Sequence, residues 1–386
     1  MREVYLDNAA TTAVCPAARE AVLSVLTDNY GNPSSLHRKG SDAEKVLREA
    51  RETAAAGLHV KEKEIFFTSG GTESNNWAIL GGARAKIRQG KHVITSAIEH
   101  PSVSESFRRL EQEGFELTVL PVDKEGFIRP ETLAEALRPD TVLVSLMAVN
   151  NEIGTVEPID RLGAVIREKN PKTLFHVDAV QAFGKIPLSP KSRGVDLLTG
   201  SSHKIHGPKG CGFLYVAEDA RILPLVAGGG QEKGLRSGTE NVPGIAGFGA
   251  AAKEALAGLT ENAAHMRALR LRLKDGLLLI DGVSVNGPAD EGLAAPHLIS
   301  ATFKGVRSEV LLHALEEKGI YVSSGSACSS HKREMSPVLK AIGMDKQAAE
   351  STLRFSLSRF NTADEIDYVL ETLSALLPML RRFTRR

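Results

Sequence analysis

The sequence has little of what marks a secreted, membrane-bound or nucleic-acid-binding protein. Its 386 residues contain no apolar run of membrane-spanning length, and the first eight lack the basic and apolar regions of a signal peptide. The formal net charge is only +1, so no excess of one sign favours nucleic acid or a membrane surface as a partner. The three cysteines, Cys15, Cys211 and Cys328, are too widely spaced for a disulfide framework or a CxxC metal site. We therefore expect a cytoplasmic protein in a reducing setting, with no nucleic acid, membrane or resident metal.

What the sequence does contain is a regular alternation of short apolar segments with helical patterns. The capping-box pattern of residues 41–44 (SDAE), for example, predicts a helix that begins there. The segments predicted as strands are residues 64–68, 92–96, 117–122, 141–147, 174–177, 195–198 and 212–216. Short strands separated by helices indicate βαβ units, and therefore an α/β fold with a mostly parallel sheet.

The pattern changes after Gly228. Residues 243–279 have the pattern of a long helical region, and a smaller α+β unit follows. We predict a large domain at residues 15–261 and a small domain formed by residues 1–14 and 262–386.

Polar residues follow the predicted strands, where the carboxyl ends of parallel strands usually bind ligands. These residues are Gly71 and Thr72, His100, Asn151, Asp178 and Gln181, and Ser201, His203 and Lys204. Taken alone, His100 fits a helix start, Asp178 a cap, and Lys204 a surface lysine beside a Gly/Pro turn. Five strand ends with polar residues are harder to explain by packing, and they predict a site at this edge.

The composition of this set fits pyridoxal phosphate (PLP). That cofactor needs a lysine for its Schiff base, an acid beside its pyridine nitrogen, and a phosphate site, which a helix N-terminus provides. Nucleotide and zinc sites fit less well, because GxxxxGK[ST], HExxH and HxxEH are absent and no GxGxxG joins a strand to a helix.

Two residues of the second half also have the character of site residues. Cys328 lies among small residues in SSGSACSS, where it has little to pack against, and this context favours a nucleophile over a structural thiol. Arg354 alternates with apolar neighbours in LRFS, and an inward orientation would make it a carboxylate clamp. The alternative for Arg354 is an exposed strand face.

Together these segments resemble the cysteine desulfurases of the NifS/IscS type, which are fold-type-I PLP enzymes of the class-V aminotransferase family. The resemblance extends over nearly the whole chain, and the SSGSAC form is similar to the first of the two desulfurase groups. The motifs that carry it, in order, are YLDNAATT (5–12), GNPSSLH (31–37), FTSGGTES (67–74), EHPSV (99–103), VNNEIGT (149–155), HVDAVQ (176–181), SSHKIHGPKG (201–210), GGGQEKGLRSGTEN (228–241), SSGSACSS (323–330) and LRFSLSRFNT (353–362).

The resemblance implies a role for each candidate residue toward the cofactor. Lys204 would form the Schiff base and carry protons, and His100 would stack on the pyridine ring. Asp178 would pair with the ring nitrogen, and Gln181 would donate to the phenolic oxygen. The phosphate would be held by Gly71, Thr72, Ser201 and His203, with Thr239 from a neighbouring subunit, so the resemblance implies a homodimer.

The resemblance also implies the reaction. Asn151 and Arg354 would bind the carboxylate of L-cysteine, and Cys328 would take its sulfur as a persulfide and leave L-alanine. The sulfur would then pass to an iron–sulfur scaffold protein, where Cys328 could transiently ligate the shared cluster, or to a tRNA-thiolation enzyme. The basic segment after Cys328, residues 329–334, leaves the acceptor open. The alternatives are a selenocysteine lyase, another fold-type-I PLP enzyme such as an aminotransferase, or a non-catalytic sulfur-carrier module.

Overall fold

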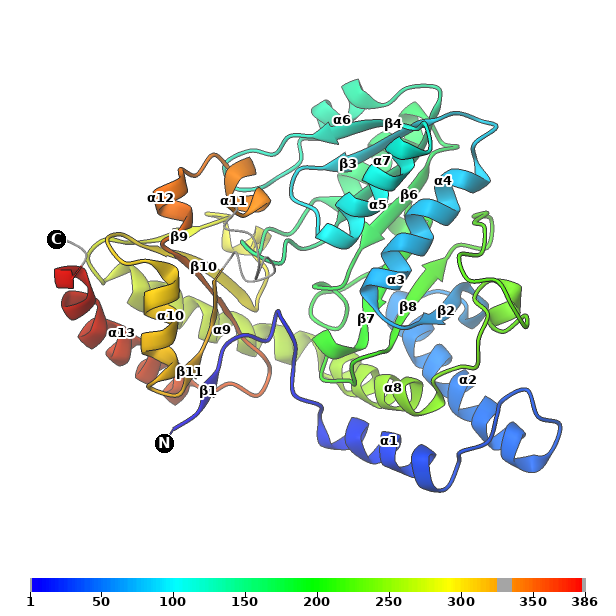
Figure 1. Cartoon of the computed structure of the whole chain (residues 1–386), viewed down its shortest axis with the longest axis horizontal. Helices are drawn as coiled ribbons and strands as arrows, with labels where there is room; N and C mark the ends of the chain where they lie inside the picture. The colour runs from blue at the N-terminus through cyan, green and yellow to red at the C-terminus, as the bar shows by residue number, and fades with distance from the viewer. Residues whose placement is uncertain (1, 325–334, 384–386) are drawn as a thin grey trace.

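The computed structural model describes residues 2–324 and 335–383. It contains a large unit built on a seven-stranded sheet and a smaller unit built on two short sheets (Figure 1). Figure 1 shows α8 (Val242–Ala257) in the large unit and the next helix, α9 (Leu259–Leu278), in the small one.

The seven-stranded sheet is parallel except for β8, which runs antiparallel to both of its neighbours. The fold is therefore α/β with a mostly parallel sheet, as predicted. In spatial order the strands are β2 (Ile65–Thr68), β8 (Gly212–Val216), β7 (Leu197–Ser201), β6 (Leu174–Asp178), β5 (Thr141–Met147), β3 (His92–Ser96) and β4 (Glu116–Leu120).

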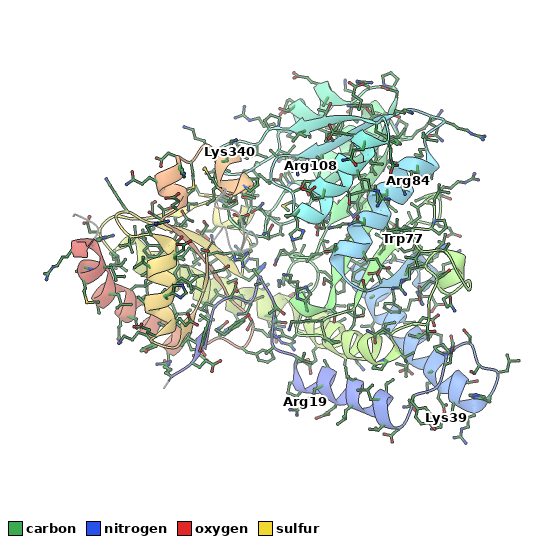
Figure 2. The ribbon with its side chains drawn as sticks, viewed as in Figure 1. Arg19, Lys39, Trp77, Arg84, Arg108 and Lys340 are labelled. Carbon is green, nitrogen blue, oxygen red and sulfur yellow. The ribbon has the colours of Figure 1, made fainter. Side chains whose placement is uncertain are left out.

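Helices cover both faces of this sheet because its strand residues alternate between two apolar cores. Phe67 packs in one core with Phe248 of α8, whereas the adjacent Phe66 packs in the other with Trp77 and Phe107. Trp77 and Arg84, labelled in Figure 2, lie on one continuous helical stretch that begins at Gly71. The first core is covered by α1 (Pro16–Thr27), α2 (Arg38–Leu58), α6 (Pro130–Ala136), α7 (Ile159–Lys169) and α8, and the second by α3 (Gly71–Asn76), α4 (Gly82–Ala85) and α5 (Pro101–Gln112).

The small unit has its own apolar core, to which the beginning of the chain contributes Val4 and Leu6. Its sheets are β1 (Val4–Tyr5) with β11 (Ile320–Tyr321), and β12 (Ser323–Ser324), β13 (Thr352–Ser356), β10 (Leu298–Phe303) and β9 (Val283–Asn286). Its helices are α9, α10 (Ser308–Glu316), α11 (Pro337–Ala341), α12 (Lys346–Ala349) and α13 (Ala363–Phe383). The domain boundary at residue 262 stays a prediction.

Two local predictions were wrong. The helix expected to begin at the residue 41–44 capping box begins one turn earlier, as α2, and His37 caps it by accepting a hydrogen bond from Gly40 N. The strand predicted at residues 195–198 is β7, displaced toward Ser201. This displacement brings Ser201 into the sheet. Within the described residues, no helix combines the length and apolarity needed to cross a membrane.

Candidate active site

Lys204 lies where β7 ends, in the short 3₁₀ turn Ser202–Lys204. Its Nζ donates to the carbonyl oxygens of Ala9 at 2.5 Å and Ala10 at 2.7 Å. These two residues belong to the N-terminal segment that begins in the small unit. Lys204 is therefore a half-buried lysine held between the units, and the reading as a free surface lysine is wrong.

Asp178 ends β6 and is held in one orientation by two donors. Asn75 Nδ2 donates to its Oδ2 at 2.7 Å, and the backbone N–H of Val180 donates to its Oδ1 at 2.9 Å. Asn75 is itself fixed, because the same Nδ2 lies 2.9 Å from Ser102 Oγ. The carboxylate of Asp178 is thus fixed at the edge of the sheet where ligands are expected.

His100 caps α5 and also faces the same edge. Its Nδ1 accepts a hydrogen bond from Ser102 N at 3.1 Å, so the neutral ring carries its proton on Nε2. Burial lowers the pKa of His100, the negative charge of Asp178 opposes this shift, and the positive charge of Lys204 adds to it. His100, Asp178 and Lys204 therefore lie near one another, and the imidazole is neutral at neutral pH.

A small-residue cradle lies at the start of α3. Gly70 has φ +152°, which favours glycine, and a Cβ on Gly71 would lie 2.7 Å from Val180 Cγ2 and 3.7 Å from Ser201 Cβ. The backbone N–H groups that begin α3 therefore lie close to Ser201. Ser201 Oγ is buried and has no hydrogen-bond partner within the described residues. An unsatisfied buried hydroxyl beside a helix N-terminus suits an anionic group.

The other residues predicted to bind the phosphate are His203, Thr72 and Thr239. His203 Nδ1 lies 3.2 Å from Thr11 Oγ1, and burial with the nearby Lys204 lowers the pKa of His203 to about 4, so it is neutral. Thr72 and Thr239 are exposed, and Thr239 lies on the loop before α8. Their contacts with a phosphate, within or between subunits, stay predictions.

Arg354 is buried on β13, as predicted for an inward-facing arginine. Its Nη1 donates to the carbonyl oxygen of Asn151 and its Nη2 to Asp7 Oδ1, both at 2.9 Å. Its Nε has no partner within the described residues. The guanidinium therefore keeps donor capacity for a further carboxylate. Asn151 contributes its backbone oxygen here.

Cys328 lies outside the described residues. The two other cysteines are buried, and burial raises the pKa of both thiols, that of Cys211 to about 12. Neither suits a thiolate nucleophile at neutral pH.

Comparison with known proteins identifies the family. Residues 4–369 match the Aminotransferase class-V family. A cysteine desulfurase IscS of Methanosarcina thermophila is 46% identical, and the match covers 99% of this chain and 94% of that protein. A cysteine desulfurase IscS of Clostridium botulinum is 43% identical, with 99% and 96% covered. This chain belongs to the class-V aminotransferases, among the cysteine desulfurases of the NifS/IscS type.

Solved structures similar to this chain agree with the fold. A NifS-like protein superposes with a TM-score of 0.92 at 40% identity, covering 98% of this chain and all of that one. A second structure, SspA in complex with cysteine, has a TM-score of 0.81 at 35% identity and covers 93% of this chain and all of that one. The fold-type-I assignment is confirmed.

Sequence reasoning missed several residues of this desulfurase's site. Asn75, Asp7, Lys185 and His297 all make contacts at the site, but each reaches it through tertiary structure. The motif TESNN contains the predicted site residue Thr72, and YLDN belongs to a motif that carries the family resemblance; these are the local signals for Asn75 and Asp7. Nothing local marks His297.

Proposed function

We propose that this chain is a PLP-dependent cysteine desulfurase that converts L-cysteine to L-alanine and takes the sulfur as a persulfide on Cys328. The observation that carries the proposal is the cluster of Lys204, Asp178 and His100 at the carboxyl edge of the sheet. The full-length similarity to cysteine desulfurases supports the same reaction.

The residues present fit the cofactor. Ser201 Oγ, which is buried and unsatisfied, and the N–H groups at Gly71 would hold the phosphate, with Thr72 and His203 beside them. Asp178 would accept a hydrogen bond from the pyridine nitrogen and keep that nitrogen protonated, and Gln181 Nε2 would donate to the phenolic oxygen. Lys204 would hold the resting cofactor, and PLP would supply an electron sink for the α-carbon of the substrate.

The surrounding residues then bind the substrate and move protons. Arg354 would bind the cysteine carboxylate through Nε and Nη2, on the edge next to Asp7, and Asn151 would keep the guanidinium in place. The amine of Lys204, when not bound to the cofactor, would remove a proton at one substrate carbon and, as an ammonium group, deliver a proton to another. His100 has Nδ1 occupied by Ser102, so it would exchange protons at Nε2.

In the sulfur step the thiolate of Cys328 would act as the nucleophile. Its sulfur forms a bond to the substrate sulfur, the carbon–sulfur bond breaks, and its electron pair stays with the substrate carbon, which takes up a proton. One L-cysteine and one thiol thus become one L-alanine and one persulfide, and no outside oxidant is required. A thiolate is required, so the rate should fall as the pH drops below the pKa of this cysteine.

The assembly, location and sulfur acceptor belong to this proposal as well. We infer a cytoplasmic homodimer in which Thr239 reaches the phosphate of the neighbouring subunit, and an acceptor that is an iron–sulfur scaffold or a tRNA-thiolation enzyme. The IscS names of the relatives support the scaffold. Incubation of persulfidated enzyme with candidate acceptors, followed by measurement of the transferred sulfur, distinguishes the two.

The deciding experiment compares the purified protein with Cys328→Ser. Both should be yellow, since Lys204 carries the cofactor, and borohydride should trap PLP on Lys204. Only the wild type should release sulfide from L-cysteine under reductant. A colourless wild-type protein would favour the non-catalytic sulfur carrier, and full turnover by Cys328→Ser would exclude the persulfide step. Parallel assays with selenocysteine test the lyase alternative.

A further inference from the structure

Gln181 is held by contacts at both ends of its amide. Its Nε2 donates to the carbonyl oxygen of Ala9 at 2.9 Å, the same oxygen that accepts from Lys204. Its Oε1 lies 3.3 Å from Lys185 Nζ and 3.3 Å from His297 Nε2. The oxygen and the NH2 group of an amide have similar shapes but opposite hydrogen-bonding roles. The partners of each therefore determine which of the two faces the site.

Lys185 is a lysine that the reaction does not use, yet it is buried. Its residue is only 7% exposed, and no hydrogen bond or ion pair in the described parts of the chain joins it to a carboxylate. Among the described residues, the titratable groups that interact electrostatically with Lys185 include Lys204, His203, His206 and His297, each of them basic. Burial, and secondarily Lys204, lower the pKa of Lys185 to about 7.

Turns in the backbone between residues 179 and 186 place the side chain of Lys185 next to that of Gln181. Residues 179–186 form two successive turns, and in the second Lys185 N donates to Ala182 O. Gly184 makes this turn with φ +71°, in the region that favours glycine. The side chains of Lys185 and Lys204 line one small cavity of about 20 Å³, so the two amines share their surroundings.

We propose that Lys185 is a positioning residue that fixes the amide of Gln181 so that its Nε2 faces the cofactor. Either protonation state of the amine can donate to Oε1, whereas a flipped amide would turn its own N–H groups toward Lys185. His297 contributes a second donor to the same oxygen. Burying an amine without an acidic partner costs free energy of folding. We therefore attribute the presence of Lys185 to its role in the site.

The test is a double-mutant cycle that uses Lys185→Met, Gln181→Met and the double variant. Methionine keeps the length of the side chain and removes the donor. Lys253→Met, at an exposed lysine on α8, is the matched control. Three quantities are measured for each: the melting temperature of the apoprotein, the affinity of the apoprotein for PLP, and the pH midpoint of the cofactor's visible absorbance.

Lys185→Met should weaken PLP binding about tenfold, equivalent to about 1.4 kcal/mol, the scale of a hydrogen bond to a charged group. The pH midpoint should rise by about one unit, because an anionic ring oxygen loses its oriented donor. In the Gln181→Met background, Lys185→Met should shift neither quantity further. The apoprotein should melt no lower than the wild type, since a buried amine has been replaced by an apolar group.

An unshifted midpoint, or an equal shift in both backgrounds, would show that Lys185 does not act through Gln181. A Lys185→Met apoprotein that melts lower or fails to fold would make Lys185 a structural residue and overturn the proposal. The inference rests on the proposed PLP enzyme. A colourless wild type would refute that function before any variant is compared, so the two failures are distinguishable.

Discussion

Glu157 should make the stability of this protein depend on pH, because its carboxyl group is buried and only one of its two oxygens accepts a hydrogen bond within the described residues. Its Oε2 accepts a hydrogen bond from Ile128 N, whereas Oε1 is buried without a partner in the described residues. Burial, together with the nearby Asp123, raises the pKa of Glu157 from 4.5 to about 8. At neutral pH the folded protein therefore keeps a proton that the unfolded chain has released.

The sign and size of the effect follow from this difference. The folded state binds the extra proton between pH 4.5 and about 8, so the contribution of Glu157 to stability falls as the pH rises through that window. Each pH unit in the window is worth about 1.4 kcal/mol, which gives a loss of about 2 to 3 kcal/mol between pH 5 and pH 7.

The perturbation is Glu157→Gln, which keeps the shape and removes the titration. The melting temperatures of wild type and variant should nearly coincide at pH 5, and the variant should melt about 5 °C higher at pH 7. Glu131→Gln, at an exposed position of α6, is the control that should show no such trend. A difference between Glu157→Gln and wild type that stays constant from pH 5 to pH 7 would refute the reasoning.

Two further predictions concern the site itself. Asn75→Ala should weaken PLP binding about tenfold, because Asp178 loses an oriented donor to its carboxylate; titration of the apoprotein with PLP measures this, and an unchanged affinity would contradict it. Arg354→Lys should raise the KM for L-cysteine about tenfold or more, because a lysine cannot replace the two-pronged guanidinium. Steady-state kinetics test this, and the cofactor spectrum, which should stay unchanged, is the control.

The parts of the site that follow strands were predictable from the sequence. Lys204 and Asp178 were predicted at strand ends because an apolar run gives way to polar residues there, and a parallel sheet brings such ends to one edge. Arg354 was predictable because it interrupts an alternating apolar strand. Each of these inferences uses only neighbouring residues.

The residues that orient the site could not be found in the same way. Asn75 contacts Asp178 across 103 positions of sequence, and His297 contacts Gln181 across 116. Local patterns contain no information about such pairs. The α2 start shows the converse error: the capping-box pattern is present at Ser41, but His37 accepts the capping hydrogen bond from Gly40 one turn earlier. The local pattern was compatible with the helix without determining its first residue.

Two acceptors of Lys204 are backbone carbonyl oxygens, those of Ala9 and Ala10. Substitutions at positions 9 and 10 change the side chain and leave these oxygens in place. A mutational scan would therefore detect only the effect of the size of the new side chain, and not the loss of the hydrogen bonds. Exchanging the following amide for an ester, which weakens the carbonyl as an acceptor, would expose their role. For this enzyme, sensitivity to substitution is therefore an incomplete record of which groups contact Lys204.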